Sequence, residues 1–178
     1  DRDGKLAIGA DEGLCQIGEH FLCRRPEREL ANQAANYFKS LGLTRDSVVM
    51  LIMRRRWEYW VCAPALIKLG VIFVPGTLQL TKKDVAYRAN AANIEMFVCV
   101  NDEYVLTQVE NALPEAPCIK YRAMVGGGKR EGWADFNEVI STFPETFERS
   151  DAVADLNNND VMQMYFTSGT TGMPKMVC

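Results

Sequence analysis

The segment SVVMLIMRRRWEYWVCAPALIKLGVIFVP, residues 47–75, holds two apolar runs on either side of a stretch with the length of a helix. The first run, Ser47–Met53, lacks the polar alternation of a half-exposed strand, which is typical of strands covered on both faces. Trp57–Leu69 predicts a helix that Gly70 ends, and Val71–Pro75 predicts a second strand. Because a strand, a helix and a strand in this order form a βαβ unit, the segment predicts a parallel sheet.

The alternation of helices and strands continues outward from this unit. Upstream, Pro26 opens a predicted helix that ends at Gly42. Downstream, Thr81 and Asp84 have the spacing of a capping box at the start of a helix. The other predicted elements are a hairpin at 5–8 and 16–23, helices at 81–93, 103–112 and 133–143, strands at 95–100, 119–125 and 161–166, a glycine turn at 126–128 and a polar connection at 150–160. The sequence therefore predicts an α/β fold with a mostly parallel sheet flanked by helices.

The composition is that of a soluble globular domain. The 178 residues are 48% apolar and 24% charged, and the net charge is −3. This charge gives no electrostatic basis for binding nucleic acid or an anionic membrane, which need clustered Lys and Arg. No apolar segment reaches the roughly 20 residues that span a bilayer, and DRDGKLAIGADEG, residues 1–13, lacks the layout of a signal peptide. We therefore expect a cytoplasmic protein without a membrane span.

The six cysteines do not have the spacing of a metal site. None forms a C-x-x-C pair, and His20 is the single histidine of the sequence. Cys62 and Cys99 lie inside apolar runs, where a reduced thiol behaves as a small hydrophobic group. We therefore predict buried structural cysteines and no metal ligands, and we interpret His20 as a surface residue.

The stretch YFTSGTTGMPK, residues 165–175, concentrates phosphate-binding groups at the end of a predicted strand. Hydroxyl groups can donate to anionic oxygens, glycines let backbone N–H groups turn toward the same ligand, and Lys175 adds a compact positive charge. Ligands of parallel sheets bind beyond the carboxyl ends of the strands, which is where this stretch is expected. It is not a Walker A loop, because Pro174 stands where that motif requires glycine and no Ser or Thr follows the lysine.

The order of these residues is more specific than their composition. TSGTTGMPK, residues 167–175, resembles the phosphate-binding signature of the adenylate-forming superfamily, which contains acyl-CoA synthetases, luciferases and peptide-synthetase adenylation domains. Residues 31–177 resemble the N-terminal part of the acyl-CoA synthetases, especially the medium-chain type, in a helix ending in Leu-Gly, a buried strand and a P-G-T turn. The segment FLCRRPEREL, residues 21–30, departs from the family, which usually has Thr-Phe or Thr-Tyr before its Glu-Leu.

The resemblance implies a reaction in two steps. A carboxylate first attacks ATP to give an acyl-adenylate, and the thiol of coenzyme A then takes the acyl group. The implied cofactors and substrates are ATP, Mg²⁺, coenzyme A and a small carboxylic acid, with a fatty acid favoured. The implied phosphate-binding residues are Thr167, Ser168, Gly169, Thr170, Thr171, Gly172 and Lys175. Such a loop positions ATP and supplies no nucleophile, so we expect no catalytic residue within this sequence.

The resemblance also suggests that residues 1–178 are the first part of a larger N-terminal AMP-binding domain. The adenine-binding segment, the acidic residue for Mg²⁺ and the lysine of the family's C-terminal domain do not follow the loop in this sequence. We therefore expect a fragment that is inactive alone. The alternatives are a non-catalytic nucleotide-binding or interaction module and another adenylate-forming enzyme, such as an aryl-CoA ligase or a peptide-synthetase adenylation domain.

Two other groups of residues allow a functional and a structural interpretation. Arg54–Arg56 with Trp57 and Trp60 could face the phosphates of a nucleotide or of coenzyme A, but we favour a solvated turn and two indoles packed in the core. The turn at residues 75–77, Pro-Gly-Thr, is interpreted as shaping the floor of the site and not as a contact to the ligand.

Overall fold

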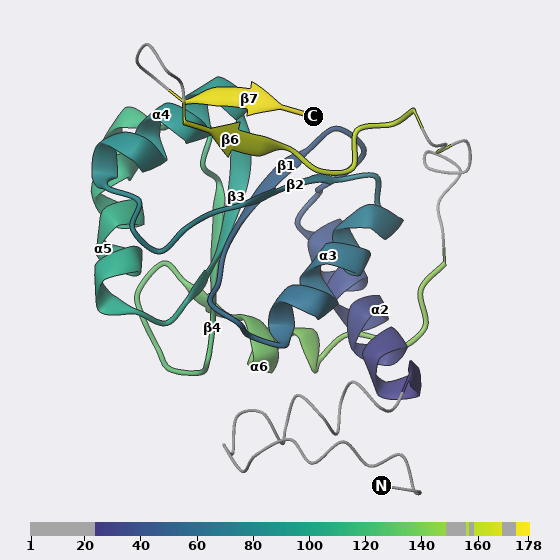
Figure 1. Ribbon diagram of the computed structural model, residues 1–178. Helices are drawn as coiled ribbons and strands as arrows, with labels where there is room; N and C mark the ends of the chain where they lie inside the picture. Colours follow the sequence, from purple (N-terminus) through teal and green to yellow (C-terminus); the bar gives the residue numbers. More distant parts are fainter. Residues whose placement is uncertain (1–23, 149–155, 157–158, 169–173) are drawn as a thin grey trace, which may run out of the picture.

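The computed structural model describes residues 24–148, 156, 159–168 and 174–178 (Figure 1). The hairpin predicted at 5–8 and 16–23 and most of the polar connection predicted at 150–160 lie outside the described residues. The same holds for His20, Cys15 and Cys23.

The centre of the fold is a five-stranded sheet. Its strands are β1 (Val48–Ile52), β2 (Ile72–Pro75), β3 (Ile94–Val100), β4 (Tyr121–Val125) and β5 (Ala134–Asp135). They lie in the order β2-β1-β3-β4-β5, and each neighbouring pair is parallel. The predicted α/β fold with a mostly parallel sheet is confirmed.

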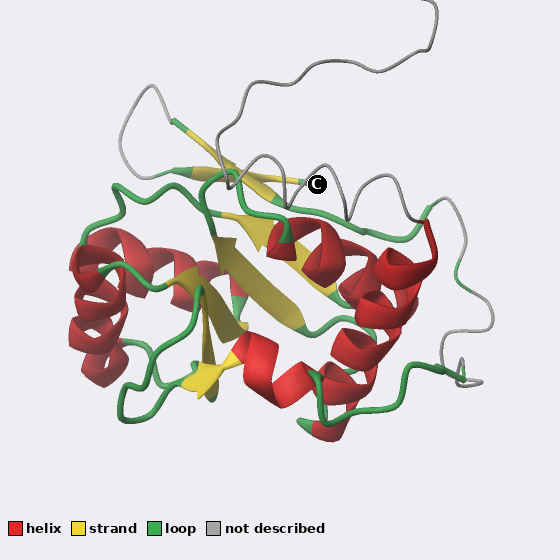
Figure 2. Ribbon diagram, turned by 90° about the horizontal axis from the view of Figure 1, so that it is seen from below, coloured by secondary structure: helices red, strands yellow, loops and turns green. Residues whose placement is uncertain are grey.

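Helices cover both faces of this sheet (Figures 1 and 2). On one face lie α2 (Arg24–Ser40), α3 (Glu58–Lys68) and α6 (Phe136–Ile140), and on the other lie α4 (Lys82–Ala92) and α5 (Glu103–Ala112). Consecutive residues of β1 alternate between the two faces, since Val49 and Leu51 join the core under α2 and α3 while Met50 and Ile52 join the core under α4 and α5. Every residue of β1 is buried, which explains why the apolar run in the sequence is unbroken.

The helix predicted at 133–143 is shorter in the structure. The carboxylate of Asp135 caps α6 by accepting hydrogen bonds from the backbone N–H groups of Asn137 at 3.0 Å and Glu138 at 3.1 Å. The residues just before the helix pair with the edge of β4 and form β5. A strand this short carries no periodicity, so the sequence did not separate it from the helix.

The predicted capping box of α4 is confirmed. Thr81 accepts a hydrogen bond from the backbone N–H of Asp84, and the Asp84 carboxylate accepts one from the backbone N–H of Thr81 at 3.0 Å. The Thr81 hydroxyl also donates to this carboxylate at 2.6 Å, and these bonds lower the pKa of Asp84. The start of α4 is therefore fixed directly after β2.

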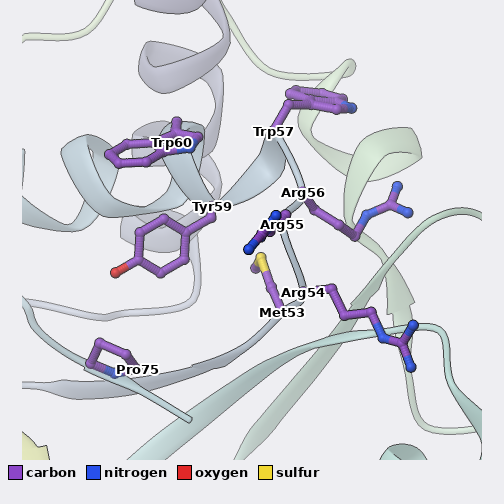
Figure 3. A pocket seen from close by; sticks show the side chains of 8 residues that line it. All are labelled: Met53, Arg54, Arg55, Arg56, Trp57, Tyr59, Trp60 and Pro75. Carbon is purple, nitrogen blue, oxygen red and sulfur yellow. The ribbon is translucent and has the colours of Figure 1, made fainter. Parts of the chain in front are cut away.

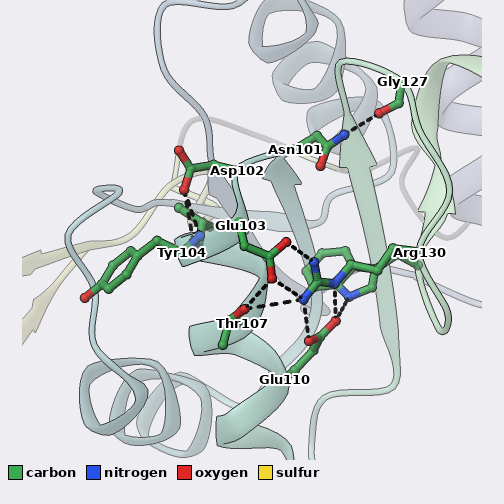
Figure 4. Close-up of polar contacts among 10 residues, drawn as sticks. Asn101, Asp102, Glu103, Tyr104, Thr107, Glu110, Gly127 and Arg130 are labelled. Atoms are coloured by element: carbon green, nitrogen blue, oxygen red, sulfur yellow. Dashed lines mark hydrogen bonds and ion pairs between the residues drawn. The ribbon is translucent and has the colours of Figure 1, made fainter.

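The glycine turn at 126–128 opens a loop that is fastened to α5 (Figure 4). Its glycines have φ values of 99°, 76° and 112°, which side chains rarely adopt, and this agrees with the predicted surface turn. Arg130 donates hydrogen bonds to Glu103 at 2.7 Å and to Glu110 at 2.6 Å, and the indole N–H of Trp133 donates to Glu110 at 2.8 Å. The bonds from Arg130 are the largest cause of a lowered pKa of the Glu110 carboxyl group.

Two of the four described cysteines are buried, as predicted, and the other two are not. Cys62 and Cys99 are buried, and burial raises the pKa of both thiols, so they remain protonated. Cys118 is partly buried and Cys178 is exposed, and all of these thiols are free.

Candidate functional site

The predicted phosphate-binding motif lies in a hairpin. Its strands, β6 (Tyr165–Thr167) and β7 (Lys175–Val177), form a separate two-stranded antiparallel sheet. The strand predicted at 161–166 is therefore displaced, because β6 begins at Tyr165 and its partner is the segment that follows the motif.

The segment before β6 fixes the hairpin to the edge of the large sheet. The N–H of Phe73 in β2 donates to the carbonyl oxygen of Met162 at 3.2 Å, and the N–H of Met164 donates to the carbonyl oxygen of Phe73 at 3.1 Å. This pairing is parallel, and Phe73 lies before the end of β2. The chain therefore runs past the carboxyl end of β2 as it enters β6, and Figure 1 shows the hairpin at the end of the sheet next to α4.

Helix α4 supports the hairpin from the side of the sheet. The hydroxyl of Tyr87 donates a hydrogen bond to the carbonyl oxygen of Pro174 at 2.9 Å. The ring of Phe166 packs against the core under α4, at 6.5 Å from the ring of Tyr87, and the Arg88 guanidinium lies 5.2 Å from its centroid. Both strands are thus anchored on α4, by a hydrogen bond and by ring and cation–π contacts.

The structure describes three of the seven predicted phosphate-binding residues. Thr167, Ser168 and Lys175 are exposed, and Thr167 lies directly opposite Lys175 in the register of the hairpin. The Thr167 hydroxyl is 3.4 Å from the carbonyl oxygen of Lys175. The hairpin therefore places an ammonium group and hydroxyl groups on the two sides of the loop. The other predicted residues, which lie outside the described residues, are Gly169, Thr170, Thr171 and Gly172.

Tyr87 and Arg88 also contact the hairpin, and neither is among the residues that the sequence predicts for the site. They are far from the hairpin along the chain, and no motif marks them. The usable signal was indirect, because a helix that follows β2 begins at the carboxyl end of the sheet, where the motif was expected.

A pocket lies beside the hairpin at the carboxyl ends of β1 and β2 (Figure 3). Its volume is about 440 Å³, and it is lined by residues 53–57, Tyr59, Trp60 and Pro75. Burial, and to a smaller extent Tyr165 of β6, raise the pKa of the Tyr59 hydroxyl.

One part of the prediction for this region is wrong. Trp60 was expected in the core, but 59% of its surface is exposed. The buried side of α3 contains Val61, Cys62, Ala65 and Leu66, and Trp60 lies outside that stripe. Trp57 packs against the core while remaining partly exposed, so only one of the two indoles follows the prediction.

A buried ion pair fixes the arginine turn. The Glu58 carboxylate is fully buried, and it accepts two hydrogen bonds from Arg56, at 3.0 Å and 2.6 Å. It also accepts a hydrogen bond from the side-chain amide of Asn137 at 3.3 Å. The bidentate geometry holds the guanidinium of Arg56 in one place, so this arginine is a structural part of the pocket wall.

The turn after β2 packs closely against β1, and its predicted role in shaping the floor of the site stays a prediction. The N–H of Gly76 donates to the carbonyl oxygen of Leu51 at 2.8 Å. A Cβ atom at this position would lie 2.8 Å from Cγ1 of Ile52 and 3.3 Å from the sulfur of Met50. The close approach of the backbone to the core of the sheet therefore requires glycine.

No group of three or more His, Cys, Asp and Glu side chains in the described part of the chain could hold a metal ion.

The fold combines a parallel α/β sheet with a hairpin beyond its carboxyl end, and the sequence of this hairpin contains the motif TSGTTGMPK. Residues 27–178 match the family model described as AMP-binding enzyme, and the chain belongs to this family.

The curated relatives are longer proteins. The chain is 35% identical over 148 residues to "Acyl-coenzyme A synthetase ACSM4, mitochondrial" of Mus musculus, which covers 83% of this chain and 24% of the relative. It is 32% identical over 151 residues to "Acyl-coenzyme A synthetase ACSM1, mitochondrial" of Homo sapiens, with 83% and 25% covered. The chain thus spans about a quarter of the length of the curated relatives that it matches.

Two solved structures share the fold. The anthranilate CoA ligase AuaEII, solved in complex with anthranoyl-AMP, has a TM-score of 0.77 and 25% identity, and the match covers 85% of this chain and 28% of the ligase. The acyl-CoA synthetase of Brucella canis has a TM-score of 0.69 and 21% identity, with 85% and 26% covered. At this identity the second likeness concerns the fold alone.

The predicted cytoplasmic location is wrong, because the curated relatives are named as mitochondrial proteins. The prediction relied on residues 1–13, and in a sequence that begins with Asp1 and covers a quarter of its relatives these residues do not show what precedes them. Of the helices in the described residues, none combines the length and the apolar character that a bilayer crossing requires.

Proposed function

We propose that the complete gene product is an ATP-dependent acyl-CoA synthetase, that residues 1–178 form the first part of its N-terminal domain, and that the hairpin from β6 to β7 holds the phosphate groups of ATP. The observation that carries the proposal is the pairing of Thr167 with Lys175 in the register of β6 and β7, directly before and after the loop. Both side chains are exposed at the carboxyl end of the sheet. The names of the relatives and the acyl-adenylate in the AuaEII structure support it.

In the first step of this reaction, a carboxylate oxygen attacks the α-phosphorus of ATP. A new oxygen–phosphorus bond forms, the bond from the α-phosphorus to the bridging oxygen breaks, and pyrophosphate leaves with its electron pair. The Lys175 ammonium and the hydroxyls of Thr167 and Ser168 would stabilise the charge that develops on pyrophosphate. The residues that complete the loop in this proposal are Gly169, Thr170, Thr171 and Gly172.

In the second step, the thiol sulfur of coenzyme A attacks the acyl carbon. A carbon–sulfur bond forms, the carbon–oxygen bond to AMP breaks, and the thiol loses its proton. The resemblance to the family implies Mg²⁺ as a further cofactor of the first step.

A fatty acid is the proposed acid, since the curated relatives are named acyl-coenzyme A synthetases. The similarity to an anthranilate CoA ligase makes an aromatic acid the second candidate. Acid-dependent exchange of pyrophosphate into ATP, measured on the complete gene product with octanoate and with anthranilate, distinguishes the two.

The same assay tests the role of the hairpin. Lys175→Ala should lower the exchange rate by roughly 100-fold, as the loss of a group that stabilises transition-state charge does. Lys129→Ala, which removes an exposed lysine outside the hairpin, should leave the rate unchanged. An unchanged rate in Lys175→Ala would refute the proposal, and ATP binding without exchange for any acid would favour a non-catalytic nucleotide-binding module.

A further inference from the structure

Arg88 is a partly buried cation on α4 that faces the hairpin. Its Nε is buried and has no hydrogen-bond partner within the described part of the chain. Asp84, one turn earlier, acts on Arg88 by its charge, but the Asp84 carboxylate already accepts hydrogen bonds from the backbone N–H and the hydroxyl of Thr81. Burial lowers the pKa of the Arg88 guanidinium, yet an arginine remains charged at neutral pH. The fold thus holds a charged group at the hairpin with a buried donor that bonds to nothing.

This arrangement does not favour the stability of the fold. A buried donor without an acceptor has lost its hydrogen bond to water, and a partly buried charge has lost part of its hydration. A methionine is unbranched and flexible, so it could fill the same space without either cost. The presence of the arginine is therefore explained by what its cation does for the hairpin.

The Arg88 cation acts on one side chain of the hairpin, Phe166. The guanidinium carbon lies 5.2 Å from the centroid of the ring, which is a cation–π distance. Phe166 packs against the core under α4, while its neighbours Tyr165 and Thr167 are exposed. Since the side chains of a strand alternate between its two faces, Phe166 points toward α4 and Thr167 points away from it. Arg88 therefore lies behind β6, on the face opposite to the Thr167 hydroxyl.

Phe166 directly precedes Thr167, which is paired with Lys175 of β7. A shift of Phe166 would therefore move the hydroxyl of Thr167 and, through the pairing of the strands, the ammonium group of Lys175. Groups that stabilise charge are effective when the fold holds them in place before the ligand arrives.

We propose that Arg88 is a positioning residue of the phosphate-binding hairpin, which holds Phe166 by a cation–π contact and so keeps Thr167 and Lys175 in place for ATP. This proposal rests on the proposed function of the hairpin.

The KM for ATP tests this role, measured on the complete gene product by acid-dependent exchange of pyrophosphate into ATP. Arg88→Met removes the cation, and the KM for ATP should rise roughly 5- to 10-fold because the hairpin would occupy its binding position for a smaller fraction of the time. The KM for the acid should not change. Arg88→Lys keeps a cation beside the ring and should raise the KM for ATP by about 2-fold at most. Lys83→Met removes an exposed cation from the same helix and should change neither KM.

A role in stability alone predicts a different result. It would lower the urea midpoint of Arg88→Met and leave the KM for ATP unchanged at a temperature where the variant is folded, and this outcome would overturn the proposal. We expect the urea midpoint of Arg88→Met to be no lower than that of the original protein, while its KM for ATP rises.

Amide hydrogen exchange locates the effect and does not require ATP. The amides of β6 and β7 should exchange at least about 5-fold faster in Arg88→Met, whereas those of β1 should keep their rate. Phe166→Leu removes the ring, and adding Arg88→Met to it should produce little further change, since the cation then has no ring to hold. Hairpin amides that exchange equally fast in Arg88→Met and in the original protein would refute the proposal.

Failure of this proposal can be distinguished from failure of the proposed function. If Lys175→Ala lowers the rate of pyrophosphate exchange while Arg88→Met leaves the KM for ATP unchanged, the function of the hairpin stands and the role of Arg88 is refuted. If Lys175→Ala has no effect, the proposed function fails. The amide hydrogen exchange of β6 and β7 then decides by itself whether Arg88 holds the hairpin in position.

Discussion

The hydroxyl of Tyr87 in α4 donates a hydrogen bond to the carbonyl oxygen of Pro174, at 2.9 Å, and so connects the helix after β2 to the residue that precedes the proposed phosphate-binding lysine. The ring of the same tyrosine contacts Phe166 of β6. The Tyr87 side chain thus contacts β6 and the residue directly before β7. The position of the loop therefore depends on a helix that is far away in the sequence.

Removal of this hydroxyl should weaken ATP binding without unfolding the protein. Tyr87→Phe keeps the ring contact and loses a hydrogen bond that contributes about 1 kcal/mol, which corresponds to a rise of roughly 5-fold in the Kd for ATP. Calorimetric titration with ATP measures this effect. Tyr104→Phe is the matched control, because Tyr104 is exposed on α5 and should have no influence. Equal affinities of the two variants would show that the hydrogen bond does not position the loop.

The sheet could be predicted from the sequence because its strands are buried on both faces. The run from Val48 to Met53 is apolar throughout, and the residues of β1 alternate between two cores. The apolar pattern therefore predicted the strand correctly. The cap of α4 was also predictable, since Thr81 and Asp84 bond within the same turn.

Features that depend on distant contacts could not be predicted. The partner of β6 is β7, and strands of three residues are too short for their periodicity to predict this antiparallel pairing. The exposure of Trp60 depends on which side of α3 faces α2 and the sheet, and both sides of this helix contain apolar residues. The ion pair between Arg56 and Glu58 was not predicted, because the run of arginines at 54–56 has the composition of a solvated turn.

The contact of Gly76 with the core predicts a loss of stability on substitution. In Gly76→Ala, the new Cβ atom would overlap Ile52 and Met50, and overpacking of this kind costs about 1–3 kcal/mol. Urea unfolding measures the free energy of unfolding. Gln79→Ala, at an exposed position of the same turn, should change it by less than about 0.5 kcal/mol. A Gly76→Ala protein as stable as this control would mean that the turn can move away from the sheet.

Breaking the buried ion pair should destabilise the protein more than replacing both of its members. Arg56→Met leaves the Glu58 carboxylate buried without its cation, and we expect a loss of about 3 kcal/mol in the free energy of unfolding. The double variant Arg56→Met/Glu58→Leu removes both charges and should recover part of this loss. Urea unfolding of the two variants gives the comparison. If the double variant were less stable than Arg56→Met, the pair would contribute through packing and not through the desolvated charge.

The network of Arg130 with α5 predicts a specific loss of stability in acid. Hydrogen bonds from Arg130 lower the pKa of Glu110 below its usual value of 4.5. The ionised carboxylate is thus favoured in the folded state. Its contribution to the free energy of unfolding is therefore complete above about pH 4.5 and is lost as the pH falls through the lowered folded pKa.

Arg130→Gln removes the charge that lowers the pKa of Glu110. Its free energy of unfolding should be lower than that of the original chain at pH 7, and the difference should shrink as the pH falls below 4.5. Urea unfolding at several pH values measures it, with Arg28→Gln as the control for loss of a surface charge. A difference that stays constant from pH 7 to pH 3 would show that Arg130 does not act by its charge on Glu110 but through contacts that do not titrate, such as its hydrogen bond to the Thr107 hydroxyl.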